Sequence, residues 1–218
     1  MLETSAAPAG PGRDCPLCPR LAEFRQANRQ AFPDGYNAPV PSFGALESRL
    51  LVVGLAPGLR GANYTGRPFT GDWAGDLLYA TLLSHGFASG TYEERADDGL
   101  ILHDCRITNA VRCVPPENKP SPAEARTCRP FLVSEIQAMP RLKVLLALGA
   151  VAHGTVIAAL QYKPSVFPFS HGAMHQLPCG LKLFDSYHCS RYNTNTGRLT
   201  VRMFEDIFKL LREEVNAT

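Results

Sequence analysis

The chain has 218 residues, of which 45% are hydrophobic, 9% aromatic and 19% charged, and its formal net charge is +2. This apolar content excludes a wholly disordered chain, and the length suits one globular domain. The longest apolar runs, at residues 50–56 and 144–152, are too short to span a bilayer and contain glycine. Residues 1–13 lack the apolar segment of a signal peptide. We therefore expect a flexible tail over residues 1–13, one domain over 14–218, and a cytoplasmic location.

The first half of the chain predicts one helix, one strand and a second helix. Residues 21–31 have a helical pattern and are followed by a loop rich in Pro, Gly and Asn at 33–43. Residues 49–54, Arg-Leu-Leu-Val-Val-Gly, form a short apolar run of the kind found in strands buried on both faces. A long glycine-rich loop at 55–72 then leads into a predicted helix at 73–85.

The middle of the chain alternates strands with helices. Residues 106–110 form a second buried strand, and 143–149 form a third, which leads into a helix ending near residue 160. Between these two strands, Ser121-Pro122-Ala123-Glu124 has the serine, proline and glutamate of a capped helix start, and this helix is expected to end near residue 139. Residues 163–172 form a Pro/Phe/His loop.

The last part of the chain completes the fold prediction. A short strand at 181–184 precedes a loop at 185–197, and the closing helix has one apolar stripe formed by Val201, Phe204, Ile207, Leu211 and Val215. Alternating strands and helices predict a three-layer α/β/α fold with a mostly parallel four-stranded sheet. In such folds the loops after the strands meet at the carboxyl edge of the sheet, so we expect the loops at 55–72, 111–120 and 185–197 to meet there.

Four of the seven cysteines have a pattern that suggests a metal or cluster site. Cys15 and Cys18 form a Cys-x2-Cys pair, and Cys113 and Cys128 flank a proline-containing segment. Four thiolates suit a zinc ion or an iron–sulfur cluster equally well, and the alternative is that they are ordinary buried cysteines. Cys105, Cys179 and Cys189 are interpreted as isolated cysteines.

The glycine-rich loop is neither a P-loop nor a dinucleotide fingerprint, because the required spacings are missing. Its glycines allow backbone to approach a ligand closely. Phe69 can present a flat face to a ligand, or it can fill the core. Asp72 can act in a site, or it can cap the helix that follows.

Histidine and arginine mark the remaining loops. His188 follows the last strand and lies among Ser, Thr and Asn residues that suit phosphate contacts. Three segments of the predicted edge, 55–71, 105–115 and 191–202, contain arginines but no acidic residue. These arginines are Arg60, Arg67, Arg106, Arg112, Arg191, Arg198 and Arg202. A basic edge of this kind indicates a polyanionic partner such as DNA.

Four segments together resemble a known family. They are Gly54-Leu55-Ala56-Pro57-Gly58, Thr65-Gly66-Arg67-Pro68-Phe69-Thr70-Gly71-Asp72, Ile107-Thr108-Asn109-Ala110-Val111-Arg112-Cys113, and His188-Cys189-Ser190 with Asn-Thr-x-Thr-Gly behind it. In this order they resemble the uracil-DNA glycosylase superfamily, and most closely its type-B branch, family 5, whose members carry an iron–sulfur cluster. The resemblance covers about residues 15–212.

The resemblance implies a 4Fe–4S cluster on Cys15, Cys18, Cys113 and Cys128. It also implies that a base turned out of DNA stacks on Phe69, that Asn109 pairs with its edge, and that His188 faces the oxygen where negative charge develops. The implied base-contacting residues are Gly54, Ala56, Phe69, Asn109 and His188.

Two motif positions depart from the family pattern. Ala56 replaces an acidic residue of the classical enzymes, and Cys189 replaces a proline. In the type-B branch the water-positioning role is assigned to the aspartate that corresponds to Asp72. We therefore expect Asp72 and His188 to be catalytic.

The resemblance implies a substrate class and a surface that binds it. The substrates would be uracil and, in this branch, hypoxanthine and xanthine in double-stranded or single-stranded DNA. We expect a monomer at the nucleoid, with Tyr192 or Leu199 as a wedge, while a sliding-clamp contact is left open by the sequence. The DNA contacts are expected from Arg60, Arg67, Ser190, Arg191, Tyr192 and Arg198. Two alternatives are an iron–sulfur redox or electron-transfer protein and a zinc-stabilised, non-catalytic nucleic-acid-binding domain.

Overall fold

The computed structural model describes residues 8–217, which surround a five-stranded sheet in the order β4-β1-β5-β7-β6. Strands β4, β1, β5 and β7 are parallel, and β6 runs antiparallel to β7 at the edge. The strands are β1 Leu50–Gly54, β4 Cys105–Asn109, β5 Val144–Leu148, β6 Met174–Gln176 and β7 Lys182–Ser186.

Burial on both faces of the sheet explains why β1 and β5 are continuous apolar runs. Along β1, Leu50 and Val52 belong to one buried cluster, whereas Leu51 and Val53 belong to a second cluster on the opposite face. Successive side chains of a strand point to opposite faces, so a strand covered on both sides needs apolar residues at every position.

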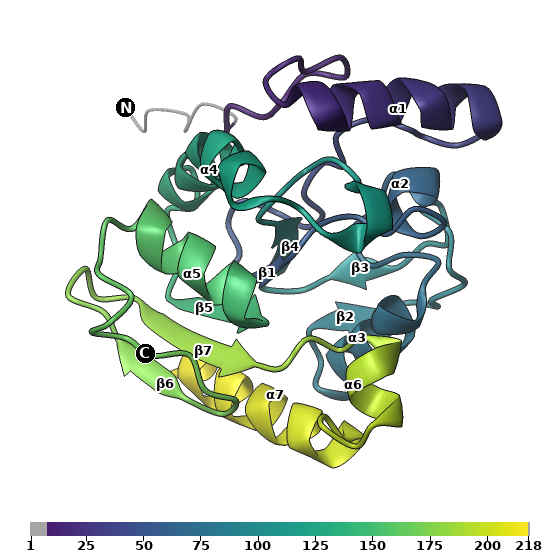
Figure 1. Cartoon of the computed structure of the whole chain (residues 1–218). Coiled ribbons are helices and arrows are strands. Elements are labelled where there is room, and N and C mark those ends of the chain that lie inside the picture. Colours follow the sequence, from purple (N-terminus) through teal and green to yellow (C-terminus); the bar gives the residue numbers. More distant parts are fainter. Residues whose placement is uncertain (1–7, 218) are drawn as a thin grey trace, which may run out of the picture.

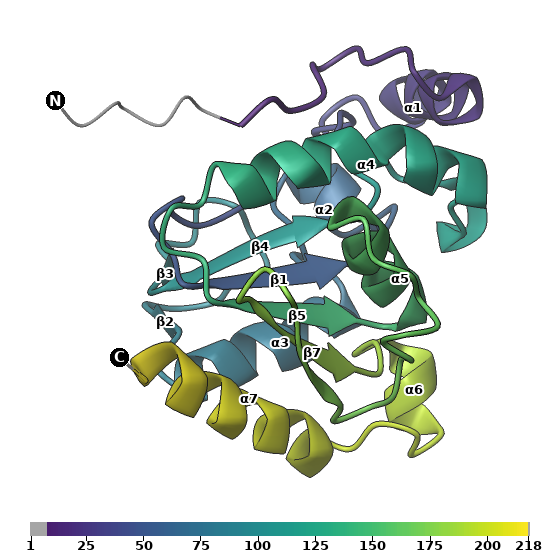
Figure 2. The same cartoon turned by 90° about the vertical axis from the view of Figure 1, so that its left-hand side faces the viewer.

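Helices cover both faces of the sheet, which confirms the predicted α/β fold with a mostly parallel sheet. Helices α3 (Trp73–Ser84) and α7 (Val201–Asn216) pack on one face, and α4 (Pro122–Gln137) and α5 (Ala150–Ala159) pack on the other (Figure 2). Helix α1 (Pro19–Ala31) lies outside α4 (Figure 1) and contributes Leu21 to a third buried cluster that contains Cys128. The predicted capping box is present, with Ser121 and Glu124 each bonded to the other's backbone N–H.

The sequence missed the shortest elements. The sheet has five strands rather than the four predicted. The additional strand, β6, has three residues at the edge of the sheet and no apolar run that would distinguish it from a loop. The predicted loops contain helices α2 (Ala62–Thr65) and α6 (Arg191–Asn195), and a small hairpin joins β2 (Ala88–Ser89) to β3 (Ile101–Leu102). A 3-10 turn, Pro116–Asn118, precedes α4.

The predicted flexible tail lies partly outside the described residues, because 1–7 are not among them. The described part of this segment contacts the rest of the protein: the Ala9 N–H donates to Ser134 Oγ over 2.8 Å, and the Arg13 guanidinium lies 5.6 Å from the centre of the Tyr36 ring. Across residues 8–217, each helix is too short or too polar to cross a membrane.

Candidate functional site

The parallel strands end on one side of the sheet (Figure 2), and the loops that follow them enclose a cavity there. The lining residues are Ala56, Gly58, Ala62, Phe69, Asp72, Ala74, Asn109 and His188, around a cavity of about 30 Å³. Of the five residues expected to contact a base, Ala56, Phe69, Asn109 and His188 thus face one cavity together with Asp72, while Gly54 lies outside the lining.

Gly54 allows Phe69 and Asn109 to approach each other at the end of β1. A Cβ atom at Gly54 would lie 2.4 Å from Phe69 Cζ and 2.5 Å from Asn109 Oδ1, so any side chain there would displace both groups. Gly54 pairs with Asn109 across β1 and β4. Gly54 does not line the cavity, but its lack of a side chain allows Phe69 and Asn109 to occupy their positions in the lining.

Asn109 carries an unused hydrogen-bond acceptor. Its side chain is buried, and among the described residues its Oδ1 atom has no hydrogen-bond partner. A buried polar atom without a partner is costly and rare in native proteins. The Asn109 amide oxygen is therefore free to accept a hydrogen bond from a donor that enters the cavity.

Phe69 lies at the junction between the cavity and the core. Its ring is stacked on His188, with centroids 6.0 Å apart and an angle of 28° between the planes, and it also belongs to a buried apolar cluster. Its backbone φ of 54° lies in the left-handed region, which is uncommon for a bulky residue and often marks a functional site. Both sequence-based interpretations, core packing and exposure to a ligand, therefore agree with its position.

Asp72 caps helix α3 and also faces the cavity. Its Oδ1 accepts a hydrogen bond of 3.0 Å from the Gly75 N–H, which confirms the capping interpretation. Its Oδ2 faces the glycine-rich loop, where a Cβ atom at Gly58 or Gly61 would lie 2.9 or 2.6 Å from it. Burial raises the pKa of the Asp72 carboxyl, and hydrogen bonds from the Gly75 and Ala74 backbone partly oppose this change.

His188 presents a neutral imidazole to the cavity. Burial lowers the pKa of His188 to about 4, so the ring carries one proton and no charge at pH 7. Among residues 8–217 no group hydrogen-bonds to this ring, whereas the His188 carbonyl accepts from Asn193 Nδ2 over 2.8 Å. The next residue, Cys189, is fully buried, and its thiol donates to the Ala74 carbonyl. The backbone around the ring is therefore fixed, while its ring nitrogens are available to a ligand.

Exposed polar and basic residues lie beside the cavity on α6 and the glycine-rich loop. Arg60, Arg191 and Arg198 are exposed, and Tyr192 keeps 72% of its surface accessible. Arg191 stacks on Trp73, with 5.2 Å between the guanidinium carbon and the ring centre, and Ser190 caps α6 by accepting from the Asn193 N–H. These residues remain candidates for DNA contact.

The structure corrects the expectation for Arg67. Its guanidinium is buried, because it forms an ion pair with the carboxylate of Asp98, 31 positions along the chain. Arg106 and Arg112 are likewise paired, both with the one carboxylate of Glu135, so three of the seven arginines counted at this edge are held by two carboxylates. Leu199 is also buried and cannot act as a wedge, which leaves Tyr192 for that role.

The four selected cysteines gather at a second site between α1 and α4. Cys15, Cys18, Cys113 and Cys128 line one cavity and are all free thiols. Burial raises the pKa of Cys18 and Cys128, and raises that of Cys113 to about 12. Among residues 8–217, no three of these sulfurs lie within 4.8 Å of one another. In the same part of the chain, the group of possible metal ligands that does lie within this distance is His153, His175 and Asp185.

Some site features carried no sequence signal. Ala62 and Ala74 line the cavity because their side chains are small, and small residues on helices are too common to mark a site.

The buried group of His153, His175 and Asp185 joins α5, β6 and β7. Its hydrogen bonds are internal, since His153 Nδ1 contacts Asp185 at 2.7 Å and its Nε2 contacts the Phe167 carbonyl at 2.8 Å.

Comparison with known proteins agrees with this geometry. The family model "Uracil DNA glycosylase superfamily" matches residues 41–212. A type-5 uracil-DNA glycosylase of Thermus thermophilus is 46% identical, covering 88% of this chain and 90% of its own, and one of Pyrobaculum aerophilum is 36% identical, covering 90% and 87%. A type-4 uracil-DNA glycosylase of Archaeoglobus fulgidus is also 36% identical, but covers only 52% of this chain and 49% of its own.

The chain has a mostly parallel α/β sheet with a small cavity at the carboxyl edge, and the family model matches most of the length of the chain. The chain therefore belongs to the uracil DNA glycosylase superfamily. Its similarity to the type-5 proteins extends over nearly the whole chain, whereas similarity to the type-4 protein covers about half. Within the superfamily it is therefore a member of the type-5 branch.

Proposed function

We propose that this protein removes uracil from DNA by hydrolysing the N-glycosidic bond, the first step of base excision repair. The observation that carries this proposal is a single cavity that combines an aromatic face, a free amide oxygen, a carboxylate and a neutral imidazole. The relatives that bear the name uracil-DNA glycosylase over nearly the full chain support the same substrate.

Asn109 is suited to distinguish uracil from cytosine. The N3–H of uracil donates a hydrogen bond and its O4 accepts one, which matches the oxygen and nitrogen of one amide. Cytosine has the opposite pattern at these two positions and would leave the buried Oδ1 of Asn109 facing another acceptor. Leaving buried polar groups unpaired is an effective way to reject a substrate.

His188 is suited to stabilise the departing base. Such a base must first leave the duplex, as in other glycosylases. Cleavage of the glycosidic bond then moves negative charge onto the base and positive charge onto the sugar. Because its pKa is about 4, His188 offers an uncharged N–H to the developing anion without exchanging a proton at neutral pH.

Asp72 is suited to position the attacking water and accept its proton. One carboxylate oxygen is held by the Gly75 N–H, which leaves the other oxygen to face the glycine-rich loop. Ala56 occupies the position where the classical enzymes have an acidic residue, so the cavity contains one carboxylate rather than two.

We expect Asp72→Asn to lower the rate of uracil excision by about 10²- to 10⁴-fold, the usual range for loss of a general base. Asparagine also caps helices, so the fold should be retained. Because burial raises the pKa of Asp72 above 3.8, the wild-type rate should fall as the pH decreases through that raised value, and this acid limb should disappear in the variant. Single-turnover rates across pH measure both effects.

Asp206→Asn, at an exposed position on α7 where the carboxylate pairs only with Lys209 among the described residues, is the matched control and should change the rate by less than about twofold. An unchanged acid limb in Asp72→Asn would assign the titration to another group.

We infer that DNA is held by Arg60, Ser190, Arg191, Tyr192 and Arg198, with Tyr192 inserted into the stack behind the extruded base. Each of the three arginines is exposed beside the cavity, as backbone contacts require. The protein is expected to act as a monomer on DNA in the cytoplasm, at the nucleoid.

We further propose that Cys15, Cys18, Cys113 and Cys128 hold a 4Fe–4S cluster. In a tetrahedral zinc site with Zn–S bonds of about 2.3 Å, the sulfurs lie about 3.8 Å apart. Among residues 8–217 no three of these sulfurs lie within 4.8 Å of one another, which favours an occupant larger than one zinc ion. When bound, the cluster would supply iron–thiolate bonds that join the segment before α1 to the loop after β4 and to α4, and we assign it a structural role.

Arg25 supports a negatively charged occupant of the cysteine site. Its guanidinium is buried beside the site, 3.8 Å from Cys113 Sγ, and it bonds to the Cys15 carbonyl. Within the described part of the chain no carboxylate forms an ion pair with it, since Asp14 pairs with Arg29 and interacts with Arg25 only at longer range, and its Nε has no partner. Buried charges are normally paired. Four thiolates around a cluster would provide the missing negative charge.

The direct test of the proposed function is an excision assay on duplexes that carry a single uracil, at a stated salt concentration because DNA binding depends on salt. We expect free uracil and an alkali-sensitive abasic site. Binding without base release would instead favour a nucleic-acid-binding domain.

A second activity on larger deaminated bases is expected, because Ala56 leaves space where an acidic side chain would otherwise stand. Duplexes that contain hypoxanthine or xanthine should yield abasic sites, more slowly than the uracil duplex. Strands that stay intact after alkali treatment would limit the protein to uracil.

A further inference from the structure

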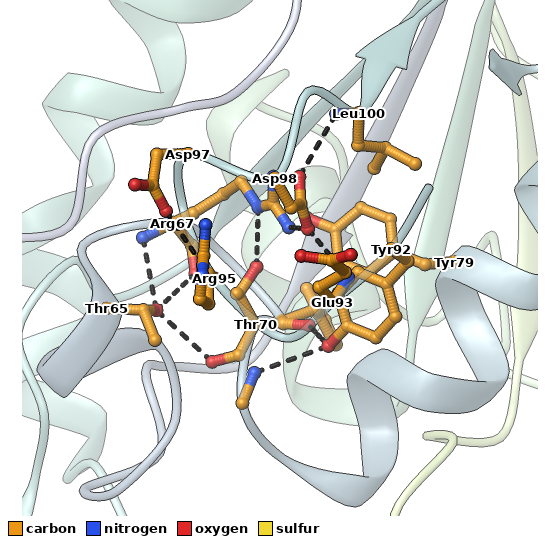
Figure 3. Close-up of polar contacts among 12 residues, drawn as sticks. Thr65, Arg67, Thr70, Tyr79, Tyr92, Glu93, Arg95, Asp97, Asp98 and Leu100 are labelled. Atoms are coloured by element: carbon orange, nitrogen blue, oxygen red, sulfur yellow. Dashed lines mark hydrogen bonds and ion pairs between the residues drawn. The ribbon is translucent and has the colours of Figure 1, made fainter. Parts of the chain in front are cut away.

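An acidic segment between β2 and β3 folds back onto the loop that carries Phe69 (Figure 3). The fully buried carboxylate of Asp98 accepts two hydrogen bonds of 2.7 Å from Nη1 and Nη2 of Arg67. It also accepts one from each of the Glu93 and Leu100 backbone N–H groups, at 3.0 Å. All of these contacts lie within the protein.

The Arg67 side chain closes the turn around Phe69 by a hydrogen bond to Thr70. Its Nε donates to Thr70 Oγ1 over 2.7 Å, so residues 67 and 70 are joined while Phe69 lies between them. The guanidinium carbon lies 5.2 Å from the ring centres of Phe43 and Tyr79. It lies 5.7 Å from that of Tyr92, so aromatic faces surround the charged group.

Two tyrosine hydroxyls hold the backbone of the same turn. Tyr79 donates to the Pro68 carbonyl over 2.6 Å. Tyr92 donates to the Phe69 carbonyl and accepts from the Gly71 N–H, both over 3.3 Å. Figure 3 shows these two stacked rings beside Arg67, with their centroids 4.6 Å apart.

The conformation of Phe69 explains why the turn needs these anchors. A bulky residue with φ of 54° persists only where its surroundings impose that conformation. The anchors come from α3 and from the segment between β2 and β3, and neither Arg67 nor Tyr92 lines the cavity. These residues therefore act on the cavity through the turn that carries Phe69 rather than by lining it, and Tyr92 also reaches Gly71, the residue before Asp72.

We propose that Arg67, Asp98 and Tyr92 form a clamp that fixes the Phe69 ring in position to stack on the extruded base, and so act as positioning residues for base excision. This inference rests on the proposed function. It assigns to the acidic segment and to Arg67 a role distinct from DNA contact.

The test is a double-mutant cycle between Tyr92→Phe and Phe69→Ala, measured as single-turnover uracil excision. Tyr92→Phe keeps the stacked ring but removes both hydrogen bonds to the turn. We expect it to lower the excision rate by about tenfold, the scale of one or two lost hydrogen bonds. In the Phe69→Ala background the same change should lower the rate by less than about twofold, because the group it positions is absent.

Tyr162→Phe is the matched control, because it removes a tyrosine hydroxyl that accepts a backbone N–H, from Cys179, outside the cavity. It should leave the rate unchanged. Arg67→Lys is the second clamp variant: lysine keeps the charge but cannot reach both Thr70 and Asp98, and it should show the same dependence on Phe69.

Equal rate losses from Tyr92→Phe with and without the Phe69 ring would overturn the clamp, and so would an unchanged rate in both clamp variants. Wild-type protein that releases no uracil would instead overturn the proposed function. The two failures are therefore distinguishable.

Discussion

His188→Ala should lower the rate of uracil excision by about 10²- to 10³-fold, the usual cost of removing one donor to a developing anion. The loss should appear in the single-turnover rate, while the affinity for DNA stays close to that of wild type, because the exposed arginines are untouched. Quench-flow excision and fluorescence anisotropy measure the two quantities separately.

The low pKa of His188 also predicts how the stability of the folded protein changes with pH. In the folded protein the ring stays neutral down to about pH 4, whereas in the unfolded chain it takes up a proton near 6.5. The unfolded state therefore binds more protons between these values, and wild-type stability should decrease as the pH falls from 6.5 towards 4. His188→Ala should weaken this dependence.

His103→Ala is the matched control for both measurements, because His103 is exposed and, among the described residues, its ring bonds only to Ser89 Oγ. A His188→Ala variant that excises uracil at the wild-type rate would remove the imidazole from the mechanism.

Cys113→Ala should remove iron and most of the folded protein together. Where a metal group is part of the native state, its binding free energy is folding free energy. Its loss also removes the thiolate nearest to the buried guanidinium of Arg25. Iron analysis, visible absorbance and thermal unfolding of the purified variant measure the effect.

Cys179→Ala, at an exposed cysteine outside the site, should keep iron and stability at wild-type levels. A Cys113→Ala variant that is fully stable without iron would refute the structural role of the cluster. Bound zinc in place of iron in the wild type would correct the identity of the occupant.

The sequence was informative where a physical pattern is local. The apolar runs of β1 and β5 are buried on both faces, and such runs predict strands of a parallel sheet covered on both sides. The parallel sheet then explains why Asn109 and His188, 79 positions apart, reach one cavity: each follows or ends a strand at the same edge.

The sequence failed where the outcome depends on distant partners. A charge count along residues 55–71 suggests that Arg67 is free, because its partner Asp98 lies on another segment. Glu135 on α4 pairs with Arg106 and Arg112 in the same way. The unused Oδ1 of Asn109 and the hydroxyl of Tyr92 depend on side-chain geometry, for which a sequence has no local signal.

The most direct test of the central claim is a crystal structure of the protein with a duplex that carries a 2′-fluorinated deoxyuridine, in which fluorine disfavours positive charge on the sugar and slows cleavage. The account predicts that the uracil lies in the cavity, stacked on Phe69, with its N3–H donating to Asn109 Oδ1 and His188 beside a base oxygen. A uracil that stays in the duplex, or that occupies a different site, would contradict it.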